Sequence, residues 1–287
     1  MTAHDTQFDL NQAPLRIGRV HLNVCDLVRM SAFYEQALGL IRHSEGGGRV
    51  TLGTPDTAVL ELRGDPSLAP VDPRAAGLFH TAFLLPERAD LARWLAHALD
   101  MQLPLQGASD HIVSEAIYLA DPEGNGVEIY TDHPITRWRG PEGQIRMATD
   151  PLDLPGLIAL ADGTHWTDFP RGGMIGHVHL QVGDIGQAEG FYRDILGFDL
   201  AARYPGASFF GAGGYHHQLA GNVWNSRGAG PRRAGTAGLD RVELIVNDPA
   251  TRAAILARAA AAAIATDYHG DTPLLRDPWG TILTLTA

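Results

Sequence analysis

A histidine, a tyrosine and a glutamate stand close together in residues 110–130, which read D-H-I-V-S-E-A-I-Y-L-A-D-P-E-G-N-G-V-E-I-Y. His111 and Tyr118 precede a D-P-E-G-N-G turn, and Glu128 follows it. This turn chemistry predicts a β-hairpin. Because side chains alternate along a strand, Glu128 shares a face with Tyr130. A carboxylate on a mostly apolar hairpin is costly unless a cation receives it, so this stretch points to a metal site.

Composition limits the classes of protein and of site. The 287 residues, 45% of them apolar, are enough for two packed domains. The single cysteine, Cys25, excludes an internal disulfide framework and a cysteine zinc site, so a metal has to use His and carboxylate. A net charge of −11 argues against nucleic acid or an anionic membrane as partner. Since no apolar run reaches the roughly 20 residues that span a bilayer and the first residues are polar, we expect a cytoplasmic protein.

An internal repeat divides the chain. Residues 17–27 (I-G-R-V-H-L-N-V-C-D-L) match residues 175–185 (I-G-H-V-H-L-Q-V-G-D-I), and F-Y-E-Q-A-L-G-L from Phe33 matches F-Y-R-D-I-L-G-F from Phe191. Both pairs are 158 positions apart (17 to 175 and 33 to 191). A fixed offset held over this length indicates duplicated modules.

Each copy reads as two β-α-β-β-β units. We place the first copy at 15–132, the second at 174–287, and a connector rich in Pro, Gly and Trp at 133–173. The hydrophobic patterns predict strands and helices in both copies. The expected strands are 19–24, 49–53, 58–63, 78–84, 176–182, 208–213, 217–223, 239–246 and 274–285, and the expected helices are 30–38, 87–99 and 250–264.

The stretch at 110–130 resembles the signature of extradiol ring-cleavage dioxygenases. That signature has a His, an aliphatic residue followed by Tyr, an acidic residue followed by Pro, a Gly and a Glu at set spacings; the matching residues here are His111, Ile117, Tyr118, Asp121, Pro122, Gly124 and Glu128. Ser109 departs from it, because the pattern prefers Gly, Asn, Thr, Ile or Val there. With the repeat, the chain resembles the vicinal-oxygen-chelate superfamily of glyoxalases, bleomycin-resistance proteins and extradiol dioxygenases, and in particular the two-domain catechol 2,3-dioxygenases. This resemblance implies an α+β fold of two domains, each of paired βαβββ modules forming an open barrel around a cavity.

The resemblance also implies a metal site. In that fold the ligands come from the first strand of each module and the last strand of the second, which here gives His21, His80 and Glu128. Two imidazoles and a carboxylate leave three coordination positions open, which suits Fe(II) binding a bidentate substrate and O2; Mn(II) fits nearly as well. His111 and Tyr118 are then expected beside the metal, as an acid-base histidine and a phenol that holds a substrate oxygen.

Two features depart from the related enzymes. Those enzymes carry a further acid-base histidine in the strand region before the second His ligand, whereas residues 51–76 contain no histidine. They also hold their iron in the C-terminal domain, whereas the triad named above lies in the first copy.

In the second copy, three positions of the site carry other residues, namely Arg241, Leu274 and Thr284. Its triad is therefore broken, and we expect this copy to serve packing and assembly. A second site with a different ligand set, for a metal or a small acidic molecule, is an alternative that would use His177, His179, His216 and His217.

The leading hypothesis is an iron-dependent dioxygenase that takes part in aromatic hydrocarbon catabolism and acts on a small aromatic diol with O2, as a homo-oligomer. Two other classes stay open. A glyoxalase-type lyase or isomerase would use an additional Glu from the last strand of the first module, where Glu61 lies. A binding protein of the bleomycin-resistance type would need no metal ligands.

Overall fold

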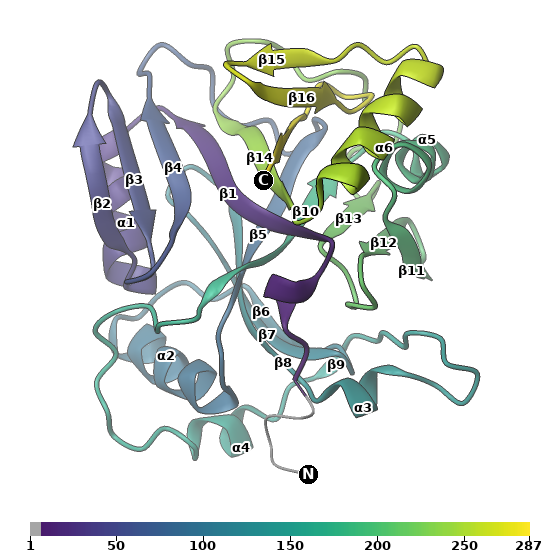
Figure 1. The fold of residues 1–287 in the computed structure, drawn as a ribbon. Helices are drawn as coiled ribbons and strands as arrows, with labels where there is room; N and C mark the ends of the chain where they lie inside the picture. The colour runs from purple at the N-terminus through teal and green to yellow at the C-terminus, as the bar shows by residue number, and fades with distance from the viewer. Residues whose placement is uncertain (1–6) are drawn as a thin grey trace.

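The computed structural model describes residues 7–287, which form two large mixed sheets with helices on their outer sides (Figure 1). From edge to edge, the eight-stranded sheet contains β15 (Asp267–His269), β16 (Thr272–Arg276), β17 (Ile282–Thr286), β14 (Gly238–Val246), β1 (Leu15–Val24), β4 (Ala58–Gly64), β3 (Arg49–Gly53) and β2 (Ile41–Gly46). The nine-stranded sheet contains β11 (Asp199–Tyr204), β12 (Ala207–Gly211), β13 (Leu219–Asn222), β10 (Met174–Gln181), β5 (Gly77–Leu84), β8 (Gly126–Asp132), β7 (Ser114–Ala120), β6 (Gly107–Asp110) and β9 (Asp150–Pro151). The helices are η2 (Leu10–Gln12), α1 (Leu27–Leu38), α2 (Arg88–Asp100), α3 (Ile135–Trp138), α4 (Leu154–Ile158), α5 (Ile185–Glu189), the π-helical η3 (Gly190–Ile195) and α6 (Pro249–Ala261).

Each module opens with a strand and a capped helix. In the first module the side chain of Asp26 accepts a hydrogen bond from the Arg29 amide and so begins α1. The helix ends at Gly39, whose φ of 76° is the left-handed conformation that glycine adopts readily. The indole of Trp94 on α2 donates to the carbonyl of Ala37 on α1 at 2.9 Å, which ties the first two modules together.

The predicted turn at the start of β8 is held by the buried side chain of Asp121. Its carboxylate accepts from the amides of Glu123 and Asn125 and from the hydroxyl of Tyr34. Asp277 makes the corresponding contacts in the other sheet, where Tyr192 donates to it at 2.7 Å. The same device in two places reflects the duplication and fixes where the last strand of each sheet begins.

The two sheets each combine strands from both halves of the chain. Strand β1 pairs antiparallel with β14, and β5 pairs antiparallel with β10. The first module therefore shares a sheet with the fourth, and the second shares a sheet with the third. The expected α+β fold of paired βαβββ modules is confirmed, but the partners differ from the consecutive pairing that the halves 15–132 and 174–287 suggested.

Several local features differ from the sequence reading. Strands β2, β6 and β11 were not expected, and His216 and His217 precede β13 instead of lying on it. The connector is also less peripheral than expected, because β9 pairs with β6. Among the described residues, no helix has the length and apolar character needed to cross a membrane.

Candidate active site

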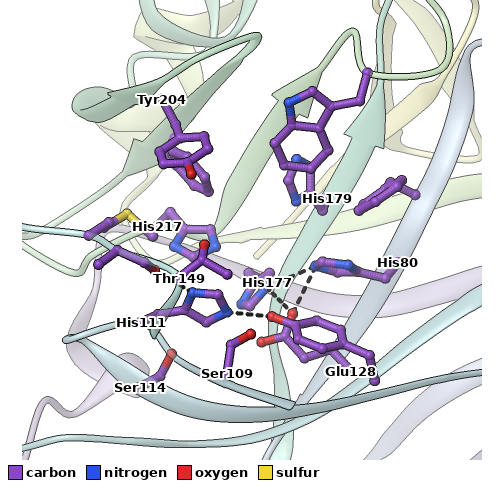
Figure 2. A pocket seen from close by; sticks show the side chains of 16 residues that line it. His80, Ser109, His111, Ser114, Glu128, Thr149, His177, His179, Tyr204 and His217 are labelled. Atoms are coloured by element: carbon purple, nitrogen blue, oxygen red, sulfur yellow. Dashed lines mark hydrogen bonds and ion pairs between the residues drawn. The ribbon is translucent and has the colours of Figure 1, made fainter. Parts of the chain in front are cut away.

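Three neighbouring strands of the nine-stranded sheet bring together two histidines and a glutamate. His80 lies on β5, Glu128 on β8 and His177 on β10, and β5 is paired with both of the other strands. Glu128 and His177 both pair with Ala82 of β5, so they flank one small residue in the same row. The sheet geometry alone therefore makes the three side chains converge (Figure 2).

The distances between their polar atoms fit a single metal ion. Oε2 of Glu128 lies 2.9 Å from Nε2 of His80 and 3.2 Å from Nε2 of His177, and the two Nε2 atoms are 3.3 Å apart. Donor atoms bound to one cation at ~2.1 Å and at right angles are about 3.0 Å apart. A neutral pair of imidazoles with one carboxylate is the donor set that Fe(II) or Mn(II) accepts, and it leaves one face open.

The protonation states favour that donor set. Burial lowers the pKa of His177 to about 4, so its ring is neutral at neutral pH. Burial opposes ionisation of Glu128, but His177 and His80 outweigh it and hold the pKa of that carboxyl well below its ordinary value. The site is thus poised as a carboxylate between two imidazoles.

His21 does not belong to this group, which corrects the predicted triad. It lies on β1 in the other sheet, where Nε2 is 2.8 Å from Glu243 and Nδ1 is 3.2 Å from Glu61. The reason is strand pairing, because β1 neighbours β14 and β4 and does not pair with β5. The cluster therefore takes its third member from the second half of the chain, at His177.

The cluster opens into a cavity of about 280 Å³. Tyr118 and His111 line it, as the signature led us to expect, and Nε2 of His111 lies 2.6 Å from the hydroxyl of Tyr118. Burial and the charge of Glu128 raise the pKa of Tyr118 well above its ordinary value, so the phenol stays protonated. The full lining is Phe79, His80, Ser109, His111, Ser114, Tyr118, Glu128, Met147, Ala148, Thr149, His177, His179, Tyr204, Phe209, His217 and Trp224.

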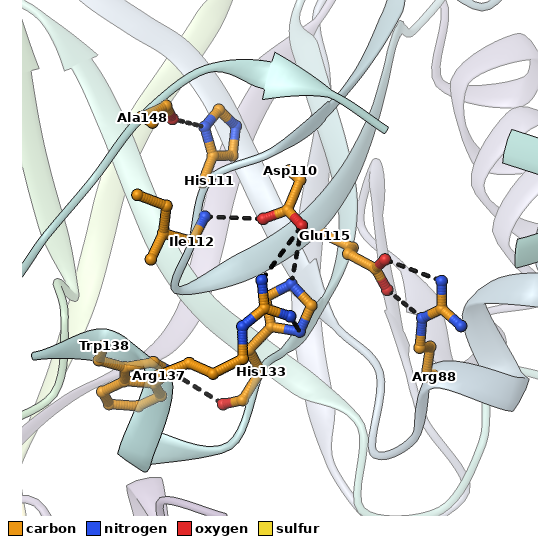
Figure 3. A network of polar contacts seen from close by, with 9 residues as sticks. All are labelled: Arg88, Asp110, His111, Ile112, Glu115, His133, Arg137, Trp138 and Ala148. Carbon is orange, nitrogen blue, oxygen red and sulfur yellow. Dashed lines mark hydrogen bonds and ion pairs between the residues drawn. The ribbon is translucent and has the colours of Figure 1, made fainter. Parts of the chain in front are cut away.

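A polar network behind the cavity fixes His111 (Figure 3). Its Nδ1 lies 2.7 Å from the carbonyl of Ala148, so this nitrogen carries the proton and Nε2 accepts from Tyr118 when the ring is neutral. Next to it, Ile112 has a φ of 71°, a left-handed conformation that is strained for a β-branched residue. The carboxylate of Asp110 accepts from the Ile112 amide at 2.8 Å and so supports that turn.

The carboxylates of this network are already neutralised. Asp110 lies 3.2 Å from Nε2 of His133 and 3.5 Å from a guanidinium nitrogen of Arg137. Glu115, the other acidic side chain near them, makes two hydrogen bonds with Arg88, at 2.5 and 2.9 Å. Asp110, Glu115 and His133 are close enough to hold a metal. The guanidinium groups nevertheless supply the positive charge, so the network is better explained as support for the His111 turn.

The four histidines that we assigned to an alternative second site lie around the same cavity. His177 is part of the ligand cluster, and the ring of His179 is 4.9 Å from that of His80. His217 lines the cavity, with its ring 4.1 Å from that of His177. His216 is fully buried behind it. The second copy therefore contributes to one shared site, and the expectation that it serves only packing and assembly does not fit this arrangement.

The polar contacts of His216 orient His217. Nε2 of His216 lies 2.8 Å from Oδ1 of Asp132, and its Nδ1 lies 2.8 Å from Nδ1 of His217. With both rings neutral, His216 donates to Asp132 and accepts from His217, which leaves Nε2 of His217 unprotonated. Burial lowers the pKa of His217 well below its ordinary value, in keeping with a neutral ring.

Sequence reasoning missed the aromatic part of the cavity and the role of His177 in the cluster. One signal for His177 was available, because the repeat reads I-G-R-V-H in the first copy and I-G-H-V-H in the second. Arg19 thus stands where the second copy has a histidine. The aromatic residues Phe79, Phe209 and Trp224 carried no comparable signal.

Comparison with known proteins agrees with this architecture. The catechol-2,3-dioxygenase of Bacillus subtilis (strain 168) is 37% identical over 236 residues, covering 80% of this chain and 82% of that protein. Among solved structures, glyoxalase I from Zea mays aligns with a TM-score of 0.58 at 16% identity, over 96% of this chain and 93% of that one. A putative dioxygenase from Bacillus subtilis subsp. subtilis str. 168 aligns with a TM-score of 0.62 at 11% identity, over 94% of this chain and 84% of that one. At these identities the two structures are similar in fold.

The family match covers both copies of the repeat. Residues 16–129 and 174–281 each match the Glyoxalase/Bleomycin resistance protein/Dioxygenase superfamily. The family predicted from the repeat and the hairpin signature is confirmed. The chain belongs to the Glyoxalase/Bleomycin resistance protein/Dioxygenase superfamily.

Proposed function

We propose that the chain is an extradiol dioxygenase that cleaves a catechol-type ring with O2 and uses Fe(II) held by His80, His177 and Glu128. The observation that carries this proposal is the meeting, in one cavity, of a two-histidine, one-carboxylate donor set and the hydrogen-bonded pair His111 and Tyr118. The similarity to a protein named catechol-2,3-dioxygenase, at 37% identity, supports the same reaction class.

The donor set determines what the metal can do. Fe(II), when bound, would offer adjacent positions to both diol oxygens and to O2 and a path for electron density between them. Glu128 brings one negative charge against two positive charges, so the site keeps a net positive charge that favours a deprotonated diol. The imidazoles of His80 and His177 add no charge of their own.

His217 and the pair His111 and Tyr118 are placed to handle protons. His217 presents a neutral ring with an unprotonated Nε2, which suits it to accept a proton from a diol hydroxyl. The phenol of Tyr118 stays protonated and can donate to a substrate oxygen. His111, held by the Ala148 carbonyl, can accept the Tyr118 proton at Nε2 and return it.

His217 also resolves one departure from the related enzymes. The sequence lacks a histidine before β5, where an acid-base residue was expected. Because the second module pairs with the third, the strand region that faces the cavity from that side belongs to the third module, just before β13. We assign the missing acid-base role to His217.

The alternative classes are less well supported by the cavity. A glyoxalase-type reaction would call on a second carboxylate, but Glu61 lies in the other sheet beside His21. Among the described residues that line the cavity, Glu128 is the one acidic side chain. A binding protein without a metal would leave Glu128 buried against two histidines without a purpose.

Oxygen uptake tests the proposal directly. The purified protein is stripped of metal, reloaded anaerobically with Fe(II) or with Mn(II), and mixed with catechol in an oxygen electrode while the coloured ring-opened semialdehyde is followed. One O2 consumed per diol, with ring opening next to the paired hydroxyls, is the expected result. Isomerisation of a glutathione hemithioacetal without oxygen uptake would favour the glyoxalase-type class instead.

A further inference from the structure

The part of the cavity beyond the ligand cluster is walled by aromatic rings. The ring of Phe79 lies 5.4 Å from that of Trp224, and the ring of His179 lies 5.8 Å from that of Phe209. His179 is also 5.1 Å from Phe79 and 5.4 Å from Trp224, so it connects this aromatic wall to His80. Here "aromatic wall" means Phe79, His179, Phe209 and Trp224. Burial lowers the pKa of His179 well below its ordinary value, so the wall carries no charge at neutral pH.

Trp224 is exposed yet held in place. Its side chain is 45% exposed at the mouth of the cavity. The indole nitrogen donates to the carbonyl of Pro205 at 2.9 Å, and the backbone amide donates to Oδ1 of Asn222 at 3.2 Å. The ring rests on Gly206, which has a φ of 75° and where a Cβ would lie 3.1 Å from the indole. A large apolar ring that is fixed before binding loses little entropy when a ligand stacks on it.

The cavity lacks a positive side chain. Among the described residues that line it there is no arginine, and the chain contains no lysine. Arg203, next to Tyr204 at the mouth, makes two hydrogen bonds of 2.8 Å with Glu189. A carboxylate on the far side of a bound ring would be desolvated against the aromatic wall without a counter-charge, which is costly.

The volume exceeds that of one ring. A cavity of about 150 Å³ holds a benzene molecule, and this cavity measures about 280 Å³. The remainder accommodates a substituent of up to roughly the size of a second ring.

We propose that the cavity selects uncharged catechols with an apolar alkyl or aryl substituent, which stacks on the aromatic wall, and that it rejects catechols with a ring carboxylate. This inference rests on the proposed dioxygenase function. It adds the substrate class, with Trp224 as the residue that determines preference for the substituent.

A substrate series tests the inference. The Fe(II) enzyme is assayed with catechol, 4-methylcatechol, 3-phenylcatechol, 3,4-dihydroxybenzoate and its uncharged counterpart 3,4-dihydroxybenzamide. We expect the alkyl and aryl catechols to have the highest kcat/KM and the benzoate the lowest, about 100-fold or more below them. The benzamide should fall between, because it has the size of the benzoate without its charge. Anaerobic calorimetry of the same compounds should give the same order of affinities without turnover.

Two variants and a control locate the effect. Trp224→Ala should lower kcat/KM for 3-phenylcatechol about 10-fold while changing catechol itself far less. Trp224→Arg should raise the activity and affinity for the benzoate relative to the benzamide, because it places a cation at the mouth. Tyr268→Ala is the matched control, since Tyr268 is 63% exposed on β15 of the other sheet, and it should change neither ratio.

The outcomes separate the two proposals. Equal kcat/KM for the benzoate and the apolar catechols, or an unchanged preference for 3-phenylcatechol in Trp224→Ala, would overturn the substrate class and leave the dioxygenase function standing. Absence of oxygen uptake with every diol would overturn the function itself.

Discussion

Replacing His177 by alanine distinguishes the ligand set in the structure from the set His21, His80 and Glu128 predicted by the sequence. The Nε2 atom of His177 lies 3.2 Å from Glu128 and 3.3 Å from His80, so His177→Ala removes one of three converging donors. Loss of a residue that merely orients a ligand already weakens metal binding 10- to 100-fold. We therefore expect the affinity to fall by more than about 100-fold.

His21→Ala is the matched comparison. His21 is as buried as His177, but its ring nitrogens face Glu243 and Glu61 in the other sheet. Its removal leaves two carboxylates short of a hydrogen-bond partner, which should cost about 1–3 kcal/mol of unfolding free energy. The metal affinity should be unchanged. A third variant, Glu128→Ala, should lose the metal like His177→Ala.

Two measurements read out these variants. Elemental analysis after anaerobic loading and dialysis gives the metal retained per chain. Thermal unfolding with and without Mn(II) gives binding independently of turnover, because a ligand present at 100 times its Kd stabilises the native state by about 2.7 kcal/mol. We expect this stabilisation in the wild type and in His21→Ala, and none in His177→Ala. Stoichiometric metal in folded His177→Ala, or its loss from folded His21→Ala, would refute the assignment of His177.

Three further predictions concern protons and positioning. Tyr118→Phe should keep the metal but lower kcat by about 10²-fold or more, as measured by oxygen uptake, since it removes the donor hydrogen-bonded to His111; an unchanged kcat would make Tyr118 structural. Asp110→Ala removes the acceptor for the Ile112 amide, so we expect a lower kcat at unchanged metal content, partly restored in Asp110→Asn; equal loss in both variants would contradict this. Because burial lowers the pKa of His177 to about 4, the unfolded chain binds more protons between about pH 6.5 and 4, and the metal-free protein should lose up to about 1.4 kcal/mol of stability per pH unit as the pH falls through that window. Urea unfolding at about pH 7 and pH 5 checks this, and equal stability at both would count against a buried neutral His177.

The parts of the site that lie within one short stretch could be predicted from the sequence. His111, Tyr118 and Glu128 belong to one hairpin, and turn chemistry sets its register, so Tyr118 pairs with Glu128 as expected. The turn itself depends on Asp121, whose contacts are mostly to residues two and four positions away. Local chemistry of this kind is encoded in consecutive residues, and sequence reasoning recovers it.

The pairing of the modules could not be predicted in the same way. Strands β1 and β10 are copies of one motif, and either could in principle lie beside β5. The choice is made by packing between segments about 100 residues apart, such as His80 and His177, and no local pattern records it. Only the difference between Arg19 and His177 in the repeat hinted that β10 carries the ligand. The aromatic wall was invisible for a similar reason, since Phe79, Phe209 and Trp224 come from separate modules or loops.

The eight-stranded sheet shows what happens when the same geometry loses its cation. In the nine-stranded sheet, Ala82 pairs with Glu128, and its small side chain leaves room between the ligands. The corresponding pair in the eight-stranded sheet is Glu243 with Thr284. The carboxylate has thus moved by one strand, and it now forms an ion pair with His21 at 2.8 Å.

Arginines complete that exchange. Arg241 stands opposite His21 in the strand register, where the nine-stranded sheet has His80 opposite His179. Its guanidinium lies 3.9 Å from Glu61, and that of Arg19 lies 3.6 Å from the same residue. Despite burial, His21 and the nearby arginines hold the pKa of Glu243 below its ordinary value. Carboxylates gathered on the concave side of such a sheet need positive charge from somewhere, and in this sheet the chain supplies it from its own side chains. A divalent cation there would have to displace guanidinium groups that already pair with the carboxylates. In the nine-stranded sheet Glu128 faces only neutral imidazoles, and for this physical reason one sheet of the two is left free to bind a metal.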